Sequence, residues 1–333
     1  MSLFGAYTVQ SRHRLTPTQI PYLTTDGKSM PDNTWFTPYR FPLSTCLSIG
    51  PSQGIVYELS DGAVVKLPFQ YPVAESPPTD DTIEQMHMSL RSLALSKKES
   101  TFYDVLANHP HPNLAQRLPT KLALGIVLPK YQSLEKVWGL HTIATRRAWI
   151  RQLVSAVAWL EHLGYMHGDL KVPNMGIDGH NQLQLFDLGS VRHCDDEGFA
   201  EQVVEDQFAL ATCIHFLASG IDLIAKTNSR VEVQETLNML KGGRGIVDEA
   251  AKDFDEVIQA GWSGNLSGFS SLSKGIADVR DNTAILPAED FPPEIQQNLD
   301  HSTIKEDHRW IDEKAYRVAW MSKGYEVPDN IWD

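Results

Sequence analysis

Cysteine is scarce in this chain of 333 residues. Its three cysteines, Cys46, Cys194 and Cys213, show no paired spacing and no His/Cys metal-binding pattern. This scarcity argues against a disulfide-stabilised secreted scaffold and against a structural zinc module. The cysteine content suits a protein of a reducing compartment.

Long apolar runs are also missing. The first thirty residues are polar and contain proline, with no apolar core of signal-peptide length. The best candidate for a membrane span, residues 208–225, contains His215, Ser219, Gly220 and Asp222. These polar residues favour a buried helix of a globular domain over a membrane span. We therefore expect a soluble intracellular protein of the cytoplasm or nucleus, with no membrane partner.

Positively charged residues are fewer than negatively charged ones. The chain has 29 Lys plus Arg against 42 Asp plus Glu, which gives a net charge of −13 with histidine neutral. No long basic run offsets this excess, so a nucleic-acid partner recognised through its phosphates is disfavoured. The charge is compatible with a basic protein substrate. The hydrophobic content of 42% is ample for a folded core.

The most informative segment is residues 167–174, HGDLKVPN, which is followed by Asp187-Leu188-Gly189. Transfer of a phosphoryl group from ATP requires a carboxylate that orients the attacking hydroxyl and a cation that steadies the phosphoryl group. It also requires an amide and a second carboxylate that hold Mg²⁺ against the phosphates. Asp169, Lys171, Asn174 and Asp187 supply these chemical types in this order.

The sequence around this segment supports a structured site over a chance match in a solvated loop. Residues 146–163 carry apolar side chains at helical spacing, and Gly164 follows as an expected C-terminal cap. After Asn174, two short apolar runs flank Gly179-His180-Asn181, a pattern that predicts a β-hairpin. We therefore expect the order helix, loop, hairpin and metal-binding acid.

This pattern resembles the H-R-D-x-x-x-x-N and D-F-G motifs of protein kinases, with Gly168 in place of the arginine and Leu188 in place of the phenylalanine. The resemblance to the protein-kinase-like superfamily covers about residues 45–280. It implies an α+β bilobal fold, with a small β-rich N-lobe and a larger α-helical C-lobe. It also implies ATP and Mg²⁺ as cofactors, with Asn174 and Asp187 as the metal ligands.

The resemblance also sets the expected domain boundaries. Residues 1–44 are an N-terminal extension, residues 45–131 the N-lobe and residues 132–280 the C-lobe. Residues 281–333 are expected to form a proline-rich linker and a C-terminal helix over 303–322, because LPAEDFPPE is followed by a helical pattern.

The expected N-lobe contains a hairpin within residues 47–68, whose apolar runs flank Ser60-Asp61-Gly62. The resemblance assigns Gly50, Gly54 and Val56 to the glycine loop over the phosphates, although the middle glycine is replaced within residues 51–53. Ordinary turn glycines of a hairpin would explain this segment equally well.

Lys66 follows Val64 and Val65 on the next strand, where kinases place the lysine that contacts the α- and β-phosphates. The alternative is an exposed strand lysine. Glu99 is the expected ion-pair partner of Lys66, and Glu84 is the alternative. Residues 71–96 begin with a stretch rich in proline and acid, which predicts a mobile insertion.

The expected hinge between the lobes is the apolar strand that runs into Pro129 and Tyr131. Proline has a backbone carbonyl but no N–H. Pro129 is therefore assigned to adenine binding through its carbonyl, Tyr131 through its amide, and Leu128 as part of the pocket wall. An ordinary strand-to-helix loop is the alternative.

The resemblance assigns Asp206 to the large-lobe helix, where it accepts hydrogen bonds from the catalytic-loop backbone. Stabilisation of a helix N-terminus by Glu205 and Asp206 is the alternative. Only eighteen residues separate Asp187 from Asp206, and no A-P-E motif occurs between them. Together with Gly168, this short interval predicts that phosphorylation of an activation loop is not the switch.

The leading functional hypothesis is an ATP- and Mg²⁺-dependent protein Ser/Thr kinase with a protein substrate. Asp169 would orient the acceptor hydroxyl and Lys171 would support the transferred phosphoryl group. A small-molecule kinase of the aminoglycoside or choline kinase type is the second hypothesis, because such enzymes share the fold and often contain H-G-D. A pseudokinase scaffold is the third.

Overall fold

The computed structural model describes residues 35–50, 54–75, 78–224, 227, 229–272 and 304–328. The chain has a mixed α+β architecture with small sheets and several helices, as the sequence predicted at this coarse level. It divides into two compact units. Over the described residues, the helical unit comprises Asn108–Ala115 and the chain from Tyr131 onward to residue 272. The sheet unit comprises the chain up to Ala107, Gln116–Lys130 and residues 304–328.

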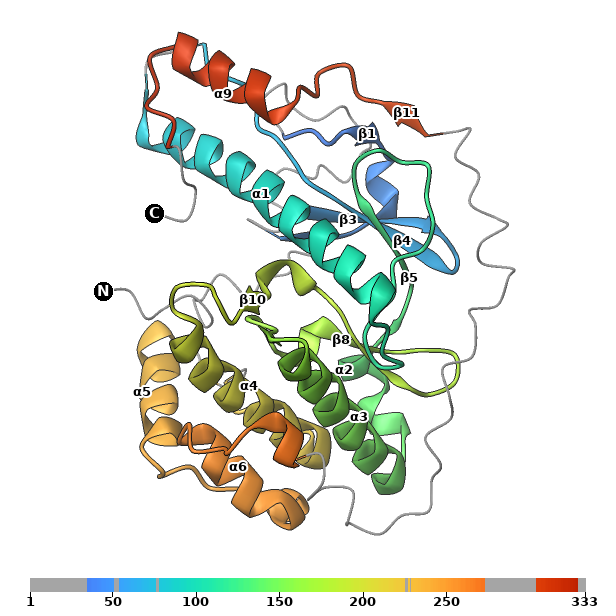
Figure 1. The fold of residues 1–333 in the computed structure, drawn as a ribbon, viewed down its shortest axis with the longest axis vertical. Coiled ribbons are helices and arrows are strands. Elements are labelled where there is room, and N and C mark those ends of the chain that lie inside the picture. The colour runs from blue at the N-terminus through green and yellow to red at the C-terminus, as the bar shows by residue number, and fades with distance from the viewer. Residues whose placement is uncertain are drawn as a thin grey trace. The chain divides into compact units, whose positions relative to one another are not determined.

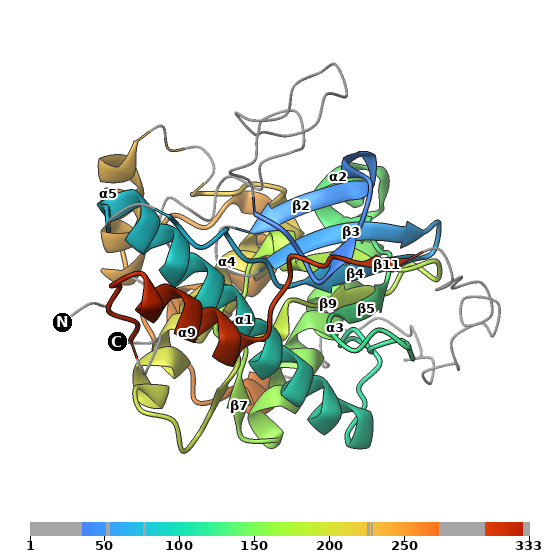
Figure 2. The same ribbon diagram turned by 90° about the horizontal axis from the view of Figure 1, so that it is seen from above.

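The sheet unit is built on four antiparallel strands in the order β2-β3-β4-β5 (Figures 1 and 2). Their bounds are β2 (Cys46–Gly50), β3 (Gly54–Ser60), β4 (Ala63–Leu67) and β5 (Ile126–Pro129). The predicted turn at Ser60-Asp61-Gly62 is confirmed, because Ser60 pairs with Ala63. Apolar side chains from these strands form the core of this unit, among them Ile55, Tyr57, Val65, Leu67 and Val127.

Among its described residues, the sheet unit also contains two α-helices and one further strand pair. The long helix α1 (Asp80–Asn108) includes residues 80–96, for which a mobile insertion was expected. Helix α9 (Glu313–Ser322) lies beside α1 (Figures 1 and 2). Strand β1 (Tyr39–Arg40) pairs with β11 (Lys305–Glu306). A C-terminal helix was expected over residues 303–322. The observed helix α9 starts only at Glu313, because strand β11 lies in the first part of this range.

The helical unit has short strands and four helices of eight residues or more among the described residues. Its strands are β6 (Gln132–Ser133), β7 (Tyr165–Met166), β8 (Met175–Ile177), β9 (Leu183–Leu185) and β10 (Arg192–His193). Its helices are α2 (Leu134–Val137), α3 (Ile143–His162), α4 (Phe199–Ser219), α5 (Arg230–Lys241) and α6 (Asp255–Trp262). Short 3-10 turns include η5 (Val172–Asn174), η6 (Leu188–Ser190) and η7 (Glu249–Phe254).

The local predictions around residues 167–174 are confirmed. Helix α3 begins after Thr142, whose side chain accepts a hydrogen bond from the Thr145 amide, and it ends before Gly164. Strands β8 and β9 pair antiparallel as the predicted hairpin. Helix α4 is buried on several faces, as expected for the most apolar stretch. In the part of the chain that the structure describes, no helix has the length and apolarity needed to cross a membrane.

Candidate active site

The candidate catalytic loop, residues 167–174, is attached to helix α4 through the buried carboxylate of Asp206. This carboxylate accepts hydrogen bonds from the backbone amide of His167 at 2.7 Å and from the amide of Gly168 at 3.1 Å. Gln202 Nε2 donates a third bond at 3.0 Å. Burial raises the pKa of Asp206, and these donors oppose that rise. Asp206 therefore holds the backbone that precedes Asp169.

The alternative role for Asp206 at a helix N-terminus is wrong. Helix α4 begins at Phe199, so Asp206 lies about two turns inside the helix. The helix dipole acts chiefly within the first turn. Asp206 therefore acts through its hydrogen bonds to the loop, as the resemblance implied.

Gly168 occupies a backbone conformation that other residues rarely adopt. Its φ angle is +78°, and a Cβ atom at this position would overlap the carbonyl oxygen of Ser190. A side chain at position 168 would therefore meet both backbone strain and a steric clash. This explains why glycine, and no arginine, stands in this motif: the loop packs directly on the backbone that follows Asp187-Leu188-Gly189.

Asp169, Lys171 and Asn174 lie together in the helical unit. Lys171 Nζ donates to Asp169 Oδ2 at 2.6 Å, and Asn174 Nδ2 donates to the same oxygen at 3.1 Å. Asn174 Nδ2 also donates to the backbone oxygen of Asp169 at 2.8 Å. Asn174 is fully buried, whereas Asp169 and Lys171 are partly exposed. The carboxylate of Asp169 is thus held in a fixed orientation while it stays accessible to solvent.

Asp187 follows Phe186, whose backbone amide and carbonyl both contact residues of this loop. The amide of Phe186 donates to the Asn174 carbonyl at 3.0 Å, and His167 Nε2 lies 3.3 Å from the Phe186 carbonyl. Asp187 itself has a φ of 66°, in the left-handed region. Such a conformation is uncommon for a non-glycine residue and occurs frequently at functional sites. Asn174 and Asp187 are therefore linked through Phe186.

The interval after Asp187 is compact. Strand β10 pairs with β7, and the Cys194 amide donates to the Gly164 carbonyl at 2.9 Å. Helix α4 then begins at Phe199. The side chains of His193, Cys194 and Asp195 also gather here, with ligand atoms within 4.8 Å of one another, although the sequence showed no His/Cys metal pattern. They are adjacent in the chain and largely exposed, so we assign them no metal.

In the sheet unit, Lys66 and Glu99 form a direct ion pair. Lys66 Nζ lies 2.7 Å from Glu99 Oε2, and the two side chains are 12% and 1% exposed. Lys66 stands on β4 opposite Val56 of β3, and Glu99 lies in the second half of α1. The structure therefore brings Lys66 together with Glu99, the first of the two candidate partners.

The predicted glycine-loop residues flank a described strand pair. Gly50 at the end of β2 pairs with Gly54 at the start of β3. Gly54 has a φ of +114°, and a Cβ there would lie 2.5 Å from the Leu67 carbonyl oxygen. Glycine is thus required at position 54 for close packing of β3 on β4. Residues 51–53, the centre of the predicted loop, lie outside the described residues.

The hinge residues divide between the units. Leu128 and Pro129 end β5, opposite Val64 and Ala63. Tyr131 belongs to the helical unit, where its ring stacks on Phe186 with 6.0 Å between the ring centroids. Burial raises the pKa of the Tyr131 hydroxyl. The roles of these residues in adenine binding stay predictions.

Two residues of the catalytic-loop network were not assigned from the sequence. His167 orients the loop because its Nδ1 accepts the Asp169 amide at 3.2 Å while its Nε2 faces the Phe186 carbonyl. Gln202 supports Asp206 from one helical turn away. The sequence contained a signal for each role, since His167 is the first residue of the motif and Gln202 lies four residues, about one helical turn, before Asp206.

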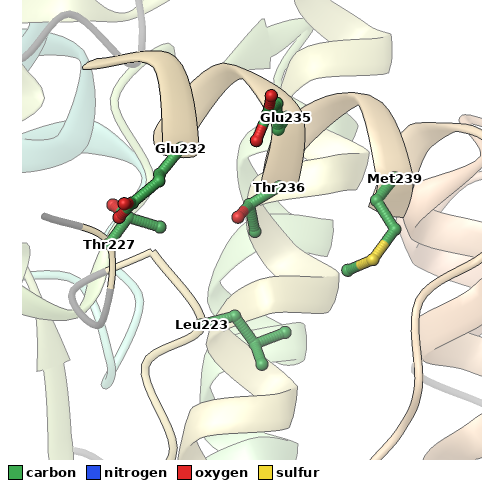
Figure 3. Close-up of a pocket in the computed structure, with 6 residues that line it drawn as sticks. All are labelled: Leu223, Thr227, Glu232, Glu235, Thr236 and Met239. Carbon is green, nitrogen blue, oxygen red and sulfur yellow. The ribbon is translucent and has the colours of Figure 1, made fainter. Parts of the chain in front are cut away.

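A separate pocket of about 390 Å³ lies at helix α5 of the helical unit (Figure 3). Its described lining residues are Leu223, Thr227, Glu232, Glu235, Thr236 and Met239. None of them was predicted as a site residue. The two glutamates disfavour an anionic ligand such as a nucleotide phosphate.

Comparison with known proteins gives a short similarity to a kinase. No family model matches the chain. An 87-residue stretch is 34% identical to the hormonally up-regulated neu tumor-associated kinase of Mus musculus, and the human counterpart is 33% identical over the same length. The match covers 24% of this chain and 12% of each relative. The chain thus matches only a small part of these relatives, and the similarity supports a kinase at a coarse level.

Proposed function

We propose that this chain is an ATP- and Mg²⁺-dependent kinase that phosphorylates serine or threonine hydroxyls of a protein. The observation that carries the proposal is the hydrogen-bonded network that joins Asp169, Asn174 and the Phe186–Asp187 backbone. The short similarity to a kinase supports the same activity. The proposal includes a two-lobed kinase fold, with the sheet unit as the small lobe and the helical unit as the large lobe.

The residues present fit a magnesium site. An amide oxygen from Asn174 and a carboxylate from Asp187 are the hard oxygen ligands that Mg²⁺ prefers. Asn174 Nδ2 points to Asp169, which fixes the orientation of the whole amide group. When bound, the metal ion supplies charge neutralisation on the phosphates.

Asp169 is the acceptor-binding residue in this proposal. Its carboxylate is fixed by Lys171 and Asn174 and remains partly exposed, so it can accept a hydrogen bond from an incoming hydroxyl. Lys171 carries a positive charge beside this carboxylate and can stabilise the phosphoryl group during transfer. In the sheet unit, Glu99 holds Lys66, which we assign to the phosphates of ATP.

A small-molecule kinase is the second candidate, and the compact segment after Asp187 favours it. In conventional protein kinases a longer segment docks the peptide around the acceptor hydroxyl. Here helix α4 begins at Phe199, and Gly168 packs on Ser190. A protein substrate must therefore bind in an unconventional manner, whereas a small alcohol needs no such segment.

The test is Mg²⁺-dependent ATP turnover by the purified chain, with generic protein acceptors and with a panel of small alcohols. Asp169→Asn should lower turnover by roughly 10²–10⁴-fold and leave nucleotide binding intact. Asp187→Asn should remove the Mg²⁺ dependence of nucleotide binding. Asp195→Asn is the matched control, because Asp195 is 87% exposed and lies in the same segment.

Three outcomes separate the candidates. Phosphate on protein acceptors, lost in Asp169→Asn, supports the proposed protein kinase. Phosphate on small alcohols alone supports the second candidate. Turnover no higher than that of Asp169→Asn, with nucleotide still bound, would indicate a pseudokinase scaffold and reject both kinase activities.

A further inference from the structure

The C-terminal segment, residues 304–328, packs on the same helix that carries Glu99 (Figures 1 and 2). Helix α9 packs its buried side chains on the first half of α1, and its first residue, Glu313, reaches Lys97 in the second half, where Glu99 also lies. The contact of the C-terminal segment with α1 is a buried aromatic and aliphatic cluster of Met86, Leu90, Tyr316, Trp320 and Tyr325. Met86, Leu90, Tyr316 and Trp320 have no exposed surface. Burial of this kind makes the C-terminal segment an integral part of the sheet unit.

The chain that leaves β4, the strand of Lys66, is bound to α1. The Phe69 amide donates to Ser92 Oγ at 3.2 Å, and the Tyr71 amide donates to Ser89 Oγ at 2.9 Å. Both serines are fully buried. Residues 69–71, which we call the connecting segment, therefore fix the register between the Lys66 strand and the Glu99 helix.

The C-terminal segment binds the connecting segment at Gln70, which lies between Phe69 and Tyr71, and at the Tyr71 carbonyl. Gln70 Nε2 donates to the Ile311 carbonyl at 2.7 Å, and the Ile311 amide lies 3.4 Å from Gln70 Oε1. Gln70 is fully buried. The Tyr316 hydroxyl donates to the Tyr71 carbonyl at 2.9 Å. The C-terminal segment thus contacts both structures that position the Lys66–Glu99 pair.

One further contact reaches the immediate neighbourhood of Glu99. Lys97 Nζ lies 2.6 Å from Glu313 Oε2 of α9. Lys97 is 67% exposed, so this ion pair contributes little stability by itself. It connects the start of α9 to α1 two residues before Glu99.

We propose that Gln70, Tyr316 and Trp320 are positioning residues for phosphoryl transfer, which act by holding α1 and β4 in the register that pairs Lys66 with Glu99. This inference rests on the proposed function of that pair. Because α1 is one continuous helix, a shift of its first half moves Glu99 as well. A misplacement of about 1 Å at a catalytic or binding group is enough to lower activity by up to about 100-fold.

The test is a double-mutant cycle on the full chain. Trp320→Ala should weaken binding of Mg²⁺–ATP by roughly tenfold, a loss similar to that in Glu99→Gln. The combined variant should bind no more weakly than either single variant, because both changes remove the same paired state. Val318→Ala is the matched control, since Val318 lies on α9 and is 56% exposed. It should bind ATP like the unchanged chain.

Equal losses from Trp320→Ala with and without Glu99→Gln would overturn the proposal, because the C-terminal segment would then act independently of Glu99. Unchanged ATP binding in Trp320→Ala would overturn it as well. Should Trp320→Ala fail to fold, Tyr316→Phe replaces it. That change removes the hydroxyl that donates to the Tyr71 carbonyl and keeps the buried ring, and the same non-additivity with Glu99→Gln is expected.

A readout that requires no nucleotide separates this inference from the proposed function. In Trp320→Ala, backbone amides in the second half of α1 should exchange with solvent roughly tenfold faster or more, and in Val318→Ala they should not. If no variant binds ATP, the proposed function fails and this exchange experiment alone decides the positioning role. Unchanged exchange around Glu99 would then reject it.

Discussion

Lys66 on strand β4 and Glu99 on helix α1 form an ion pair with an Nζ–Oε2 distance of 2.7 Å, and Glu99 is 1% exposed. Their positions are 33 residues apart in the chain. The connecting segment that follows β4 is hydrogen-bonded to α1, and α9 packs on the same helix. A buried carboxylate depends strongly on such a neighbouring cation.

Replacement of this cation should destabilise the sheet unit. Lys66→Met removes the ion partner of Glu99 and should lower the free energy of unfolding by about 2–4 kcal/mol, measured by urea denaturation. The double variant Lys66→Met with Glu99→Leu should recover most of this loss, because no buried charge then remains. Lys97→Met is the exposed control, and its effect should be below about 1 kcal/mol. A loss in the double variant as large as in Lys66→Met would contradict this account.

Any side chain at position 168 should disrupt the catalytic loop. Gly168→Ala combines a positive φ with a clash against the Ser190 carbonyl, so we expect a loss of about 2–4 kcal/mol in the free energy of unfolding, together with loss of turnover. Gly168→Arg, which restores the residue type of the kinase motif, should be at least as damaging. Gly179→Ala is the matched control, because a Cβ there meets no atom within 4 Å. Wild-type stability of Gly168→Ala would show that the loop can relax away from Ser190.

The buried carboxylate of Asp206 should matter more for activity than its neighbour on the same helix. Asp206→Asn keeps one acceptor oxygen but places an NH₂ group against the amide donors of His167 and Gly168, so turnover should fall by about tenfold or more. Glu205→Gln, which removes an exposed ion pair with Lys241, should leave turnover nearly unchanged. Equal turnover of the two variants would remove Asp206 from the positioning network.

The stability of the chain should fall in mild acid because of His111. Burial lowers the pKa of His111 from 6.5 to about 4, and its Nδ1 accepts the Asn113 amide while its Nε2 faces Ser155 Oγ. Between these pKa values the unfolded chain binds more protons than the folded chain, so stability is fully present above pH 6.5 and is lost as the pH falls towards 4. A shift of this size contributes about 3 kcal/mol. It is measured by urea denaturation across this range, and His111→Asn should flatten the pH dependence. An NMR titration that gives His111 a pKa near 6.5 would refute this explanation of the acid sensitivity.

The sequence was sufficient to predict those elements whose structure is determined by one local signal. The turn at Ser60-Asp61-Gly62 and the α3 helix were predicted because their glycine and periodic apolar signals lie within a few residues. The contacts of Asp206 with the loop were implied by the kinase resemblance. The start of α4 at Phe199 was missed, since the acidic stretch before it carries little apolar periodicity.

The association of α1 with the C-terminal segment could not be predicted from local pattern. Ser89 and Ser92 are buried in α1 as hydrogen-bond acceptors, so the helix looks polar at positions that face the interior. Its buried residues also lie on more than one face, because the sheet and α9 both pack on it. Hydrophobic periodicity cannot reveal a helix whose interior face includes serine and whose partner is more than 200 residues away.

The contact between Gly168 and Ser190 also bears on how a cell could adjust the proposed kinase activity. In kinases whose catalytic loop contains an arginine in place of this glycine, the arginine binds a phosphate on the activation loop. Adding or removing that phosphate switches the same molecule between two levels of activity. Here the Gly168 backbone lies directly against the Ser190 backbone, and residues 167–174 contain no arginine. For the proposed kinase, total output is then expected to follow the amount of folded protein, and synthesis and degradation become the means of control.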